Sequence, residues 1–205
     1  MNIIFPDDLN RAGGLIMLII ITTLSYLNNL SLLYIIKYLL NTQINYFLKY
    51  VVFKPLMGDN SFPIIGTGTR PEGAMNCGEF RDDFFNPDIV PTLSKSYGFP
   101  SGHSQSSGFF ATFIYDNFKD NPYILIPFML YSLYIPYTRI QLGCHTIQQV
   151  IVGFLYGIIF YYIIENVHKG LNNFIYYCKN RKEINKKKKI LNKPVIEHDD
   201  DFVSV

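Results

Sequence analysis

Two histidines with basic neighbours are the residues of this chain best suited to chemistry. His103 follows the string Pro-Ser-Gly at residues 100–102. His145 lies six residues after Arg139 and four residues before Gln149. Imidazole is the side chain best suited to nucleophilic attack or proton transfer near neutral pH. Arginine binds phosphate oxygens through two parallel hydrogen bonds. These residue types together indicate an anion-binding site in which a histidine is placed to attack or to transfer a proton.

Further cations and a helix N-terminus extend this pattern. Lys49 stands near the end of an expected helix, and Arg70, followed by proline, stands in the loop after it. Ser101 and Gly102 lie where the next helix is expected to begin, and helix N-termini bind anions. Lys54 is an alternative to Lys49, although we expect Lys54 to extend from the helix end towards water. No acidic cluster accompanies these cations, so we expect no metal ion and no cofactor.

The helices that must position these residues are apolar enough to cross a membrane. Residues 12–36, 96–115, 121–138 and 140–164 form charge-free runs of 25, 20, 18 and 25 residues. A membrane-spanning helix needs about 20 mainly apolar residues. Charged residues make up 17% of the chain, against roughly 25% in soluble proteins. The sequence therefore predicts an all-α, polytopic membrane helix bundle rather than a soluble domain.

We expect about five transmembrane helices in a membrane-embedded domain that covers residues 1–166. They lie near residues 13–27, 30–53, 101–118, 122–137 and 146–164. Pro55 is expected to end the second helix, and Gly153 with Gly157 offers a small-residue face for close helix packing. The long loop over residues 55–100 is rich in proline and glycine. Residues 167–205 are expected to form a basic and acidic tail, mostly disordered.

The distribution of basic residues predicts the orientation of these helices. Nine of the 18 basic residues lie between Lys169 and Lys193, on the same face as Lys119. By the positive-inside rule this face is cytoplasmic, so the long loop and the chemical residues face the lumen or the cell exterior. We expect the cysteines to be unpaired thiols. A Cys77–Cys144 bridge is the alternative, because both residues lie on the same face. A net charge of +2 gives no indication of nucleic-acid binding.

In chain order, the three clusters resemble the three-part signature of the type-2 phosphatidic acid phosphatase superfamily. That signature is a Lys and Arg-Pro, then Pro-Ser-Gly-His, then Arg-x5-His-x3-Asp. The resemblance covers roughly residues 40–155, and within the superfamily the chain is most similar to dolichyldiphosphatase-like members. The supporting strings are Leu40-Asn41…Asn45…Lys49…Pro55, Tyr97-Gly-Phe-Pro-Ser-Gly-His-Ser-Gln105 and His145-Thr146…Gln149-Val150.

The resemblance implies a role for each motif residue. His145 would attack phosphorus and form a phosphohistidine, His103 would protonate the departing oxygen, and Gln149 would orient His145. The residues that hold the phosphate would be Lys49, Arg70, Ser101, Gly102 and Arg139. The reaction would need no metal.

Two positions depart from the signature. In the family the arginine follows the lysine by seven residues, whereas here position 56 is leucine and Arg70 comes 21 residues after Lys49. Arg70 must therefore fold back to reach a phosphate. Gln149 stands where most of the superfamily has aspartate, as it does in dolichyldiphosphatase-like members, and it can orient an imidazole without adding charge.

The resemblance implies hydrolysis of a polyprenyl diphosphate, dolichyl diphosphate in particular, to the monophosphate and phosphate. The partners would be this lipid substrate and the bilayer, with no nucleic acid, in the endoplasmic reticulum membrane if the protein is of eukaryotic type. One alternative is a phosphatase for glycerolipid or sphingolipid monophosphates, and another is a membrane scaffold with a degenerate site. Vanadate-dependent haloperoxidases share the motifs but are generally larger and soluble. The oligomeric state stays open.

Overall fold

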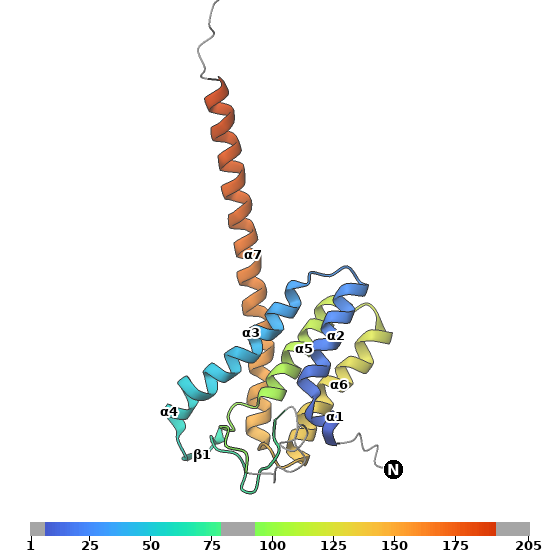
Figure 1. Cartoon of the computed structure of the whole chain (residues 1–205), viewed down its shortest axis with the longest axis vertical. Coiled ribbons are helices and arrows are strands. Elements are labelled where there is room, and N and C mark those ends of the chain that lie inside the picture. The colour runs from blue at the N-terminus through green and yellow to red at the C-terminus, as the bar shows by residue number, and fades with distance from the viewer. Residues whose placement is uncertain (1–6, 79–92, 192–205) are drawn as a thin grey trace, which may run out of the picture. The chain divides into compact units, whose positions relative to one another are not determined.

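A computed structural model of the chain describes residues 7–78 and 93–191. The chain divides into two compact units, residues 1–164 and residues 165–205. The first unit is a helix bundle, and Figure 1 traces its order along the chain. Its elements are α1 (Asp7–Arg11), α2 (Gly13–Leu27), α3 (Leu33–Phe47), the π-helical segment η1 (Leu48–Phe53), α4 (Lys54–Met57), β1 (Ser61–Phe62), β2 (Gly66–Thr67), α5 (Gly102–Phe118), α6 (Pro122–Gln141) and the first part of α7 (Ile147–Leu191).

The helix predicted over residues 13–27 coincides with α2, and that over 101–118 with α5. The helix predicted over residues 122–137 extends as α6 to Gln141. The prediction that Pro55 ends the second helix is wrong, because helical backbone continues through η1 and α4 to Met57. Pro55 is the second residue of α4, directly after the π-helical segment η1. The turn comes instead at Gly58, whose φ of +53° suits glycine.

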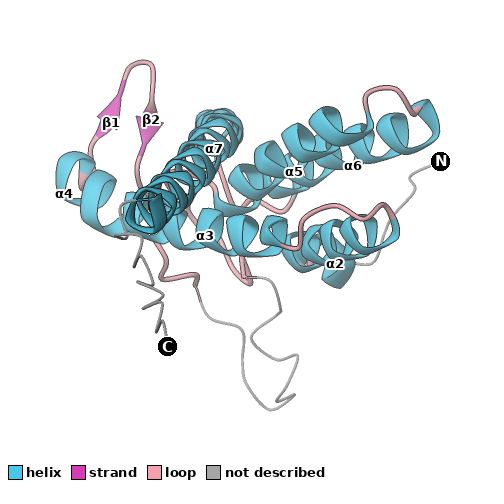
Figure 2. Ribbon diagram, turned by 90° about the horizontal axis from the view of Figure 1, so that it is seen from above, coloured by secondary structure: helices cyan, strands magenta, loops and turns pink. Residues whose placement is uncertain are grey.

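Helix α5 is the centre of the bundle. Its side chains Phe109, Phe113 and Ile114 are fully buried, and the apolar cluster around them extends to α2, α3 and α6. Seen from above, α2 and α3 form one row and α5 and α6 form the other (Figure 2). A helix buried on most sides cannot be moved cheaply, because interiors are close-packed. The start of α5 is therefore a fixed point of the fold.

Close backbone contact joins α5 to the first part of α7. A Cβ atom added at Gly153 would overlap the carbonyl oxygen of Ser101, and one at Gly157 would overlap that of Gln105. Only glycine permits this approach, which confirms the predicted small-residue face. The packing sets the N-terminus of α5 beside the N-terminus of α7.

Polar side chains fill part of the bundle interior. The fully buried Gln105 donates to the side-chain oxygen of Asn41 at 3.0 Å and accepts from the amide of Asn45 at 2.9 Å. These bonds join α3 to α5. Buried amides need such partners, because an unsatisfied polar group costs about 1–3 kcal/mol.

The described part of the second unit is helical, whereas the sequence predicts a mostly disordered tail. Helix α7 runs on to Leu191, and side chains such as Lys169, Lys182 and Glu183 are exposed. Lysine, arginine and glutamate are good helix formers. Extending a helix that is already nucleated costs far less than starting one. The acidic end of the predicted tail lies outside the described residues.

Candidate active site

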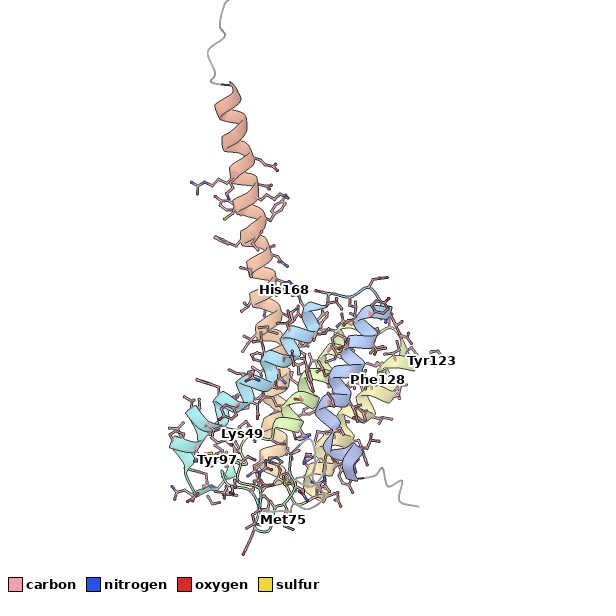
Figure 3. All side chains as sticks on the ribbon, viewed as in Figure 1. Lys49, Met75, Tyr97, Tyr123, Phe128 and His168 are labelled. Carbon is pink, nitrogen blue, oxygen red and sulfur yellow. A yellow bond between two sulfur atoms is a disulfide. The ribbon has the colours of Figure 1, made fainter. Side chains whose placement is uncertain are left out.

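The residues singled out by type and spacing gather at one end of the helix bundle. Figure 3 labels Lys49, Tyr97 and Met75 towards this end, while Tyr123, at the start of α6, lies at the other. The site is built from η1, the loop that follows β2, the N-terminus of α5 and the turn between α6 and α7.

His145 is the most constrained ionisable group in this site. It is 3% exposed, its Nε2 lies 3.1 Å from Nη1 of Arg70, and its Nδ1 lies 2.9 Å from Oε1 of Gln149. A guanidinium only donates hydrogen bonds, so Nε2 accepts and the ring proton sits on Nδ1, which donates to Gln149. His145 is thus held as the neutral tautomer with its Nε2 lone pair towards the cations.

The surroundings of His145 favour this neutral form. Burial lowers the pKa of His145 well below its ordinary value of 6.5, and the charges of Arg70 and Lys49 lower it further. The hydrogen bond to Gln149 opposes the shift, and the charge of Arg139 adds to it. A neutral imidazole at pH 7 can act as nucleophile or base without first losing a proton.

The sequence pattern Thr-x-x-Gln at residues 146–149, which can be recognised without a structure, positions His145. Thr146 and Gln149 form a capping box at the start of α7: Thr146 Oγ1 accepts from the Gln149 N–H at 3.3 Å, and Gln149 Oε1 accepts from the Thr146 N–H at 3.4 Å. Thr-x-x-Gln is a known N-terminal helix signal. His145 directly precedes this box, so its backbone is fixed where the helix begins.

Gln149 also binds the loop that carries Arg70. Its Nε2 donates to the carbonyl oxygens of Thr67 at 2.9 Å and Thr69 at 2.6 Å. A carboxylate at this position could accept from His145, but it has no hydrogen to donate to those carbonyls. Glutamine at position 149 therefore suits a chain whose arginine is supplied by this longer loop.

Arg70 folds back to the site, as its distance from Lys49 in the sequence requires. Its Nη1 donates to the carbonyl oxygen of Cys144 at 2.9 Å as well as to His145. On the other edge of the guanidinium, Nε and Nη2 donate to the hydroxyl of Ser96 at 3.1 and 2.7 Å. Burial lowers the pKa of Arg70 to about 10, which still leaves it charged at neutral pH.

A disulfide between Cys77 and Cys144 closes this loop onto the α6–α7 turn, with the two Cα atoms 5.6 Å apart. The expectation that both are unpaired thiols is wrong. They are 67 residues apart in the sequence, and only the tertiary fold packs them together, with Ala74 and Leu142. The bridge ends one residue before His145, so it joins the Arg70 loop directly to the site.

The two candidate lysines occupy different environments. Lys49 is 8% exposed and its Nζ donates to the carbonyl oxygen of Tyr97 at 2.9 Å. Its charge is one of those that act on His145. Lys54 is exposed, lies over the ring of Tyr50 at 5.8 Å, and lines a cavity of about 400 Å³ that Arg70 also lines. The geometry therefore groups Lys49, and not Lys54, with His145.

The remaining predicted residues lie around the N-terminus of α5. Ser101 is fully buried and its hydroxyl accepts from that of Ser104 at 3.0 Å, and Gly102 opens the helix. His103 donates from Nε2 to the carbonyl oxygen of Arg11 at 2.8 Å. N–H groups in the first turn of a helix are oriented to bind an anion.

Arg139 is fully buried at the end of α6. Its Nη1 donates to the carbonyl oxygen of Asn10 at 3.4 Å and its Nη2 to that of Cys77 at 3.3 Å. Among the described residues, no group of three His, Cys, Asp or Glu side chains could hold a metal ion. The site is thus a set of cations around a neutral imidazole.

Comparison with known proteins gives the family of the chain. The family model of the PAP2 superfamily matches residues 14–172, which is more than half of the chain. No curated protein and no solved structure matches the chain. PAP2 proteins are helical and generally membrane-associated, and they are phosphatases that act on lipid phosphates. A family-model match over this length shows that the chain belongs to the PAP2 superfamily.

Proposed function

We propose that this protein is a lipid diphosphate phosphatase that removes the terminal phosphate of a polyprenyl diphosphate, such as dolichyl diphosphate, without a metal ion. The observation that carries the proposal is the state of His145. It is buried as the neutral tautomer, with Nε2 facing Arg70 and with Lys49 and Arg139 acting on it electrostatically. Such a site can bind a phosphoryl group and attack it.

The first step is the arrival of the phosphate. In the unliganded site, the hydrogen bond from Arg70 Nη1 occupies the His145 lone pair. A phosphoryl oxygen is a stronger acceptor than a neutral imidazole, because it is charged. Arg70 would therefore turn to the phosphate, joined by Lys49, Arg139 and the N–H groups near Gly102, and Nε2 would be released for attack.

Two transfers of the phosphoryl group would follow. Nε2 of His145 forms a bond to the terminal phosphorus, the bond from phosphorus to the bridging oxygen breaks, and His103 supplies a proton to that oxygen. Water then attacks the phosphohistidine, His103 takes a proton from it, and phosphate leaves. Positioning and charge stabilisation provide most of the catalysis in such transfers.

The surface of the first unit supports a membrane location, for which we propose about five spanning helices. Among the described residues, the segment Ile147–Ile184 of α7 is the one helix with the length and composition to cross a membrane, and α2 is a shorter apolar helix. Large apolar side chains also face outwards from α6 and from the first part of α7. One row on α6 and one on the first part of α7 are each more than half exposed: Ile126, Leu130, Leu133 and Tyr137, and Ile147, Ile151, Leu155 and Ile159.

Such rows are unusual on a soluble monomer, where large apolar patches mark interaction surfaces. The interior of the same bundle holds fully buried polar side chains such as Asn41, Gln105 and Arg139. An apolar exterior around a polar site suits a protein surrounded by lipid.

Two features support an active site in the lumen or outside the cell. The basic residues after Lys169 favour a cytoplasmic location for the second unit. The Cys77–Cys144 disulfide lies at the site, and disulfides persist in oxidising compartments such as the endoplasmic reticulum lumen. With Cys178 replaced by serine, a cysteine at the exposed Lys95 should resist impermeant maleimide added from the cytoplasmic side. A cysteine at the exposed Lys182 should react, and the reverse pattern would overturn the orientation.

The proposal is tested by phosphate release from purified protein in EDTA, with polyprenyl diphosphate, polyprenyl monophosphate and phosphatidate as parallel substrates. We expect the diphosphate to react fastest and vanadate to inhibit. Faster release from a monophosphate would support the monoester phosphatase instead. Release from none of them would indicate a scaffold. Loss of activity in EDTA, restored by a divalent metal, would contradict the histidine mechanism.

A further inference from the structure

A buried arginine outside the predicted signature lies next to the site. Arg11 is the last residue of α1 and is 8% exposed. Its Nε and Nη1 atoms are buried and, within the part of the chain that the structure describes, have no hydrogen-bond partner. The family match begins at residue 14, after Arg11, so membership of the family gives this residue no role.

A buried cation whose N–H groups have no hydrogen-bond partner is costly. An isolated charge removed from water loses far more solvation energy than a native fold tolerates, unless a counter-charge is present. Arginine stays charged at physiological pH, and an apolar side chain in the same place would avoid the cost. The unpartnered Nε and Nη1 of Arg11 therefore indicate an anionic ligand.

The main chain around Arg11 is attached to two residues of the site. The carbonyl oxygen of Arg11 accepts from Nε2 of His103 at 2.8 Å. The carbonyl oxygen of Asn10, one residue earlier, accepts from Nη1 of Arg139 at 3.4 Å. The charges that act on His145 are those of Arg70, Lys49 and Arg139, and Arg11 is not among them. Arg11 thus adjoins the histidine assigned to the proton, not the one assigned to attack.

This side of the site receives the leaving group. In phosphoryl transfer the attacking and departing atoms lie roughly in line, on opposite sides of phosphorus. When His145 Nε2 bonds to the terminal phosphorus of a lipid diphosphate, the electron pair of the broken bond stays on the bridging oxygen, near His103. The departing molecule is then a lipid monophosphate, which is an anion. A lipid monophosphate substrate would instead release a neutral alcohol.

We propose that Arg11 binds the inner, departing phosphate of a lipid diphosphate and so makes the site selective for diphosphates over monophosphates. This inference rests on the proposed function. It assigns a specificity-determining residue to a position outside the family signature.

The test compares Arg11→Ala, Arg11→Gln and Arg11→Lys with wild-type protein on polyprenyl diphosphate and polyprenyl monophosphate. Arg181→Ala, which removes an exposed arginine of the second unit, is the matched control. We expect Arg11→Ala to lower kcat/KM for the diphosphate about 10²-fold, the typical loss for one charge-stabilising donor. For the monophosphate it should change by less than about threefold, and Arg11→Lys should recover part of the lost selectivity.

A binding measurement gives a second readout. Methylenediphosphonate, which carries two phosphonates, should inhibit wild-type protein more tightly than inorganic phosphate does, and Arg11→Ala should remove that difference while inhibition by vanadate is unchanged. An equal loss on both substrates, or an unchanged ratio between them, would overturn the inference. If no Arg11 variant folds, equal inhibition of wild-type protein by methylenediphosphonate and phosphate would overturn it. Failure of the wild type on every lipid phosphate would refute the proposed function itself, and this inference with it.

Discussion

The candidate site has a helix-borne half and a loop-borne half, which are held in different ways. His145 and Gln149 are four residues apart and are fixed by the first turn of α7. Arg70, in contrast, is held by contacts between residues that are far apart in the sequence. It reaches Cys144 and His145 across 74 and 75 residues, and its loop reaches Gln149 across 80 and 82 residues.

This difference predicts how each half of the site responds to mutation. A helix start is determined by neighbouring residues, so the His145–Gln149 pair survives changes elsewhere in the chain. The position of Arg70 depends on a disulfide, on two bonds from Gln149 and on the Ser96 hydroxyl acting together. Mutations that remove one of these contacts at a time should therefore reduce the positioning of Arg70 gradually.

The largest effect is expected from the helix-borne half. His145→Ala should lower kcat by about 10⁴-fold or more, because it removes the proposed nucleophile and not merely a stabilising contact. The protein should still fold, since α7 keeps its capping box. Single-turnover assays with ³²P-labelled lipid diphosphate would measure both turnover and the phosphoenzyme. His168→Ala, which removes a half-buried histidine of the second unit, is the control, and a labelled phosphoenzyme in His145→Ala would contradict the assignment.

The next largest effect should come from the arginine of the loop. Arg70→Ala should lower kcat/KM by about 10²–10³-fold, because it removes a charge-assisted donor to the transition state. Lys49→Ala should have an effect of similar size, whereas Lys54→Ala should stay within about threefold of wild type, since Lys54 is exposed and is not among the charges that act on His145. Steady-state kinetics on one polyprenyl diphosphate would compare the three variants. If Lys54→Ala were as damaging as Arg70→Ala while Lys49→Ala stayed active, the lysine assignment would be wrong.

A smaller effect should follow from removal of the Cys77–Cys144 disulfide, which holds the loop. Replacing Cys77 and Cys144 together by serine should lower the free energy of unfolding by about 2–4 kcal/mol. It should lower kcat/KM by about 10-fold, because Arg70 loses one of its constraints without losing its charge. Thermal unfolding and kinetics on the same preparation would measure both. Cys178→Ser, which leaves the bridge intact, should change neither. Full activity in the double variant would show that Gln149 and Ser96 alone position the loop.

The smallest effect concerns the pH dependence of activity. It involves Gln149, which contacts both His145 and the loop that carries Arg70. His145 must be neutral to attack, and its lowered pKa keeps it neutral to a pH below 6.5. The acid limb of kcat/KM should therefore lie below pH 6.5. Gln149→Glu places a carboxylate beside Nδ1, which favours the imidazolium and should move this limb to higher pH. It should also reduce kcat a few-fold, since glutamate cannot donate to Thr67 and Thr69. If this variant left the pH profile unchanged, the acid limb would not report the protonation of His145.

Much of the fold followed from patterns that are local in the sequence. Charge-free runs located α2, α5, α6 and the first part of α7, and glycine spacing predicted a close-packing face on α7, which the structure places against α5. The continuation past Pro55 and the helical second unit were missed. In both places the backbone continues a helix that is already formed. A pattern of apolar residues does not predict such a continuation.

The sequence by itself determined the helix bundle, the two histidines and the cations that belong with them, because motif spacing acts through a few neighbouring residues at helix ends. Only the tertiary structure decided which lysine joins His145, how Arg70 returns to the site, and that Cys77 and Cys144 pair. It also decided that Arg11 is buried beside His103. The physical reason is that each of these contacts joins residues dozens of positions apart, and their proximity is set by how the helices pack, which no local pattern encodes.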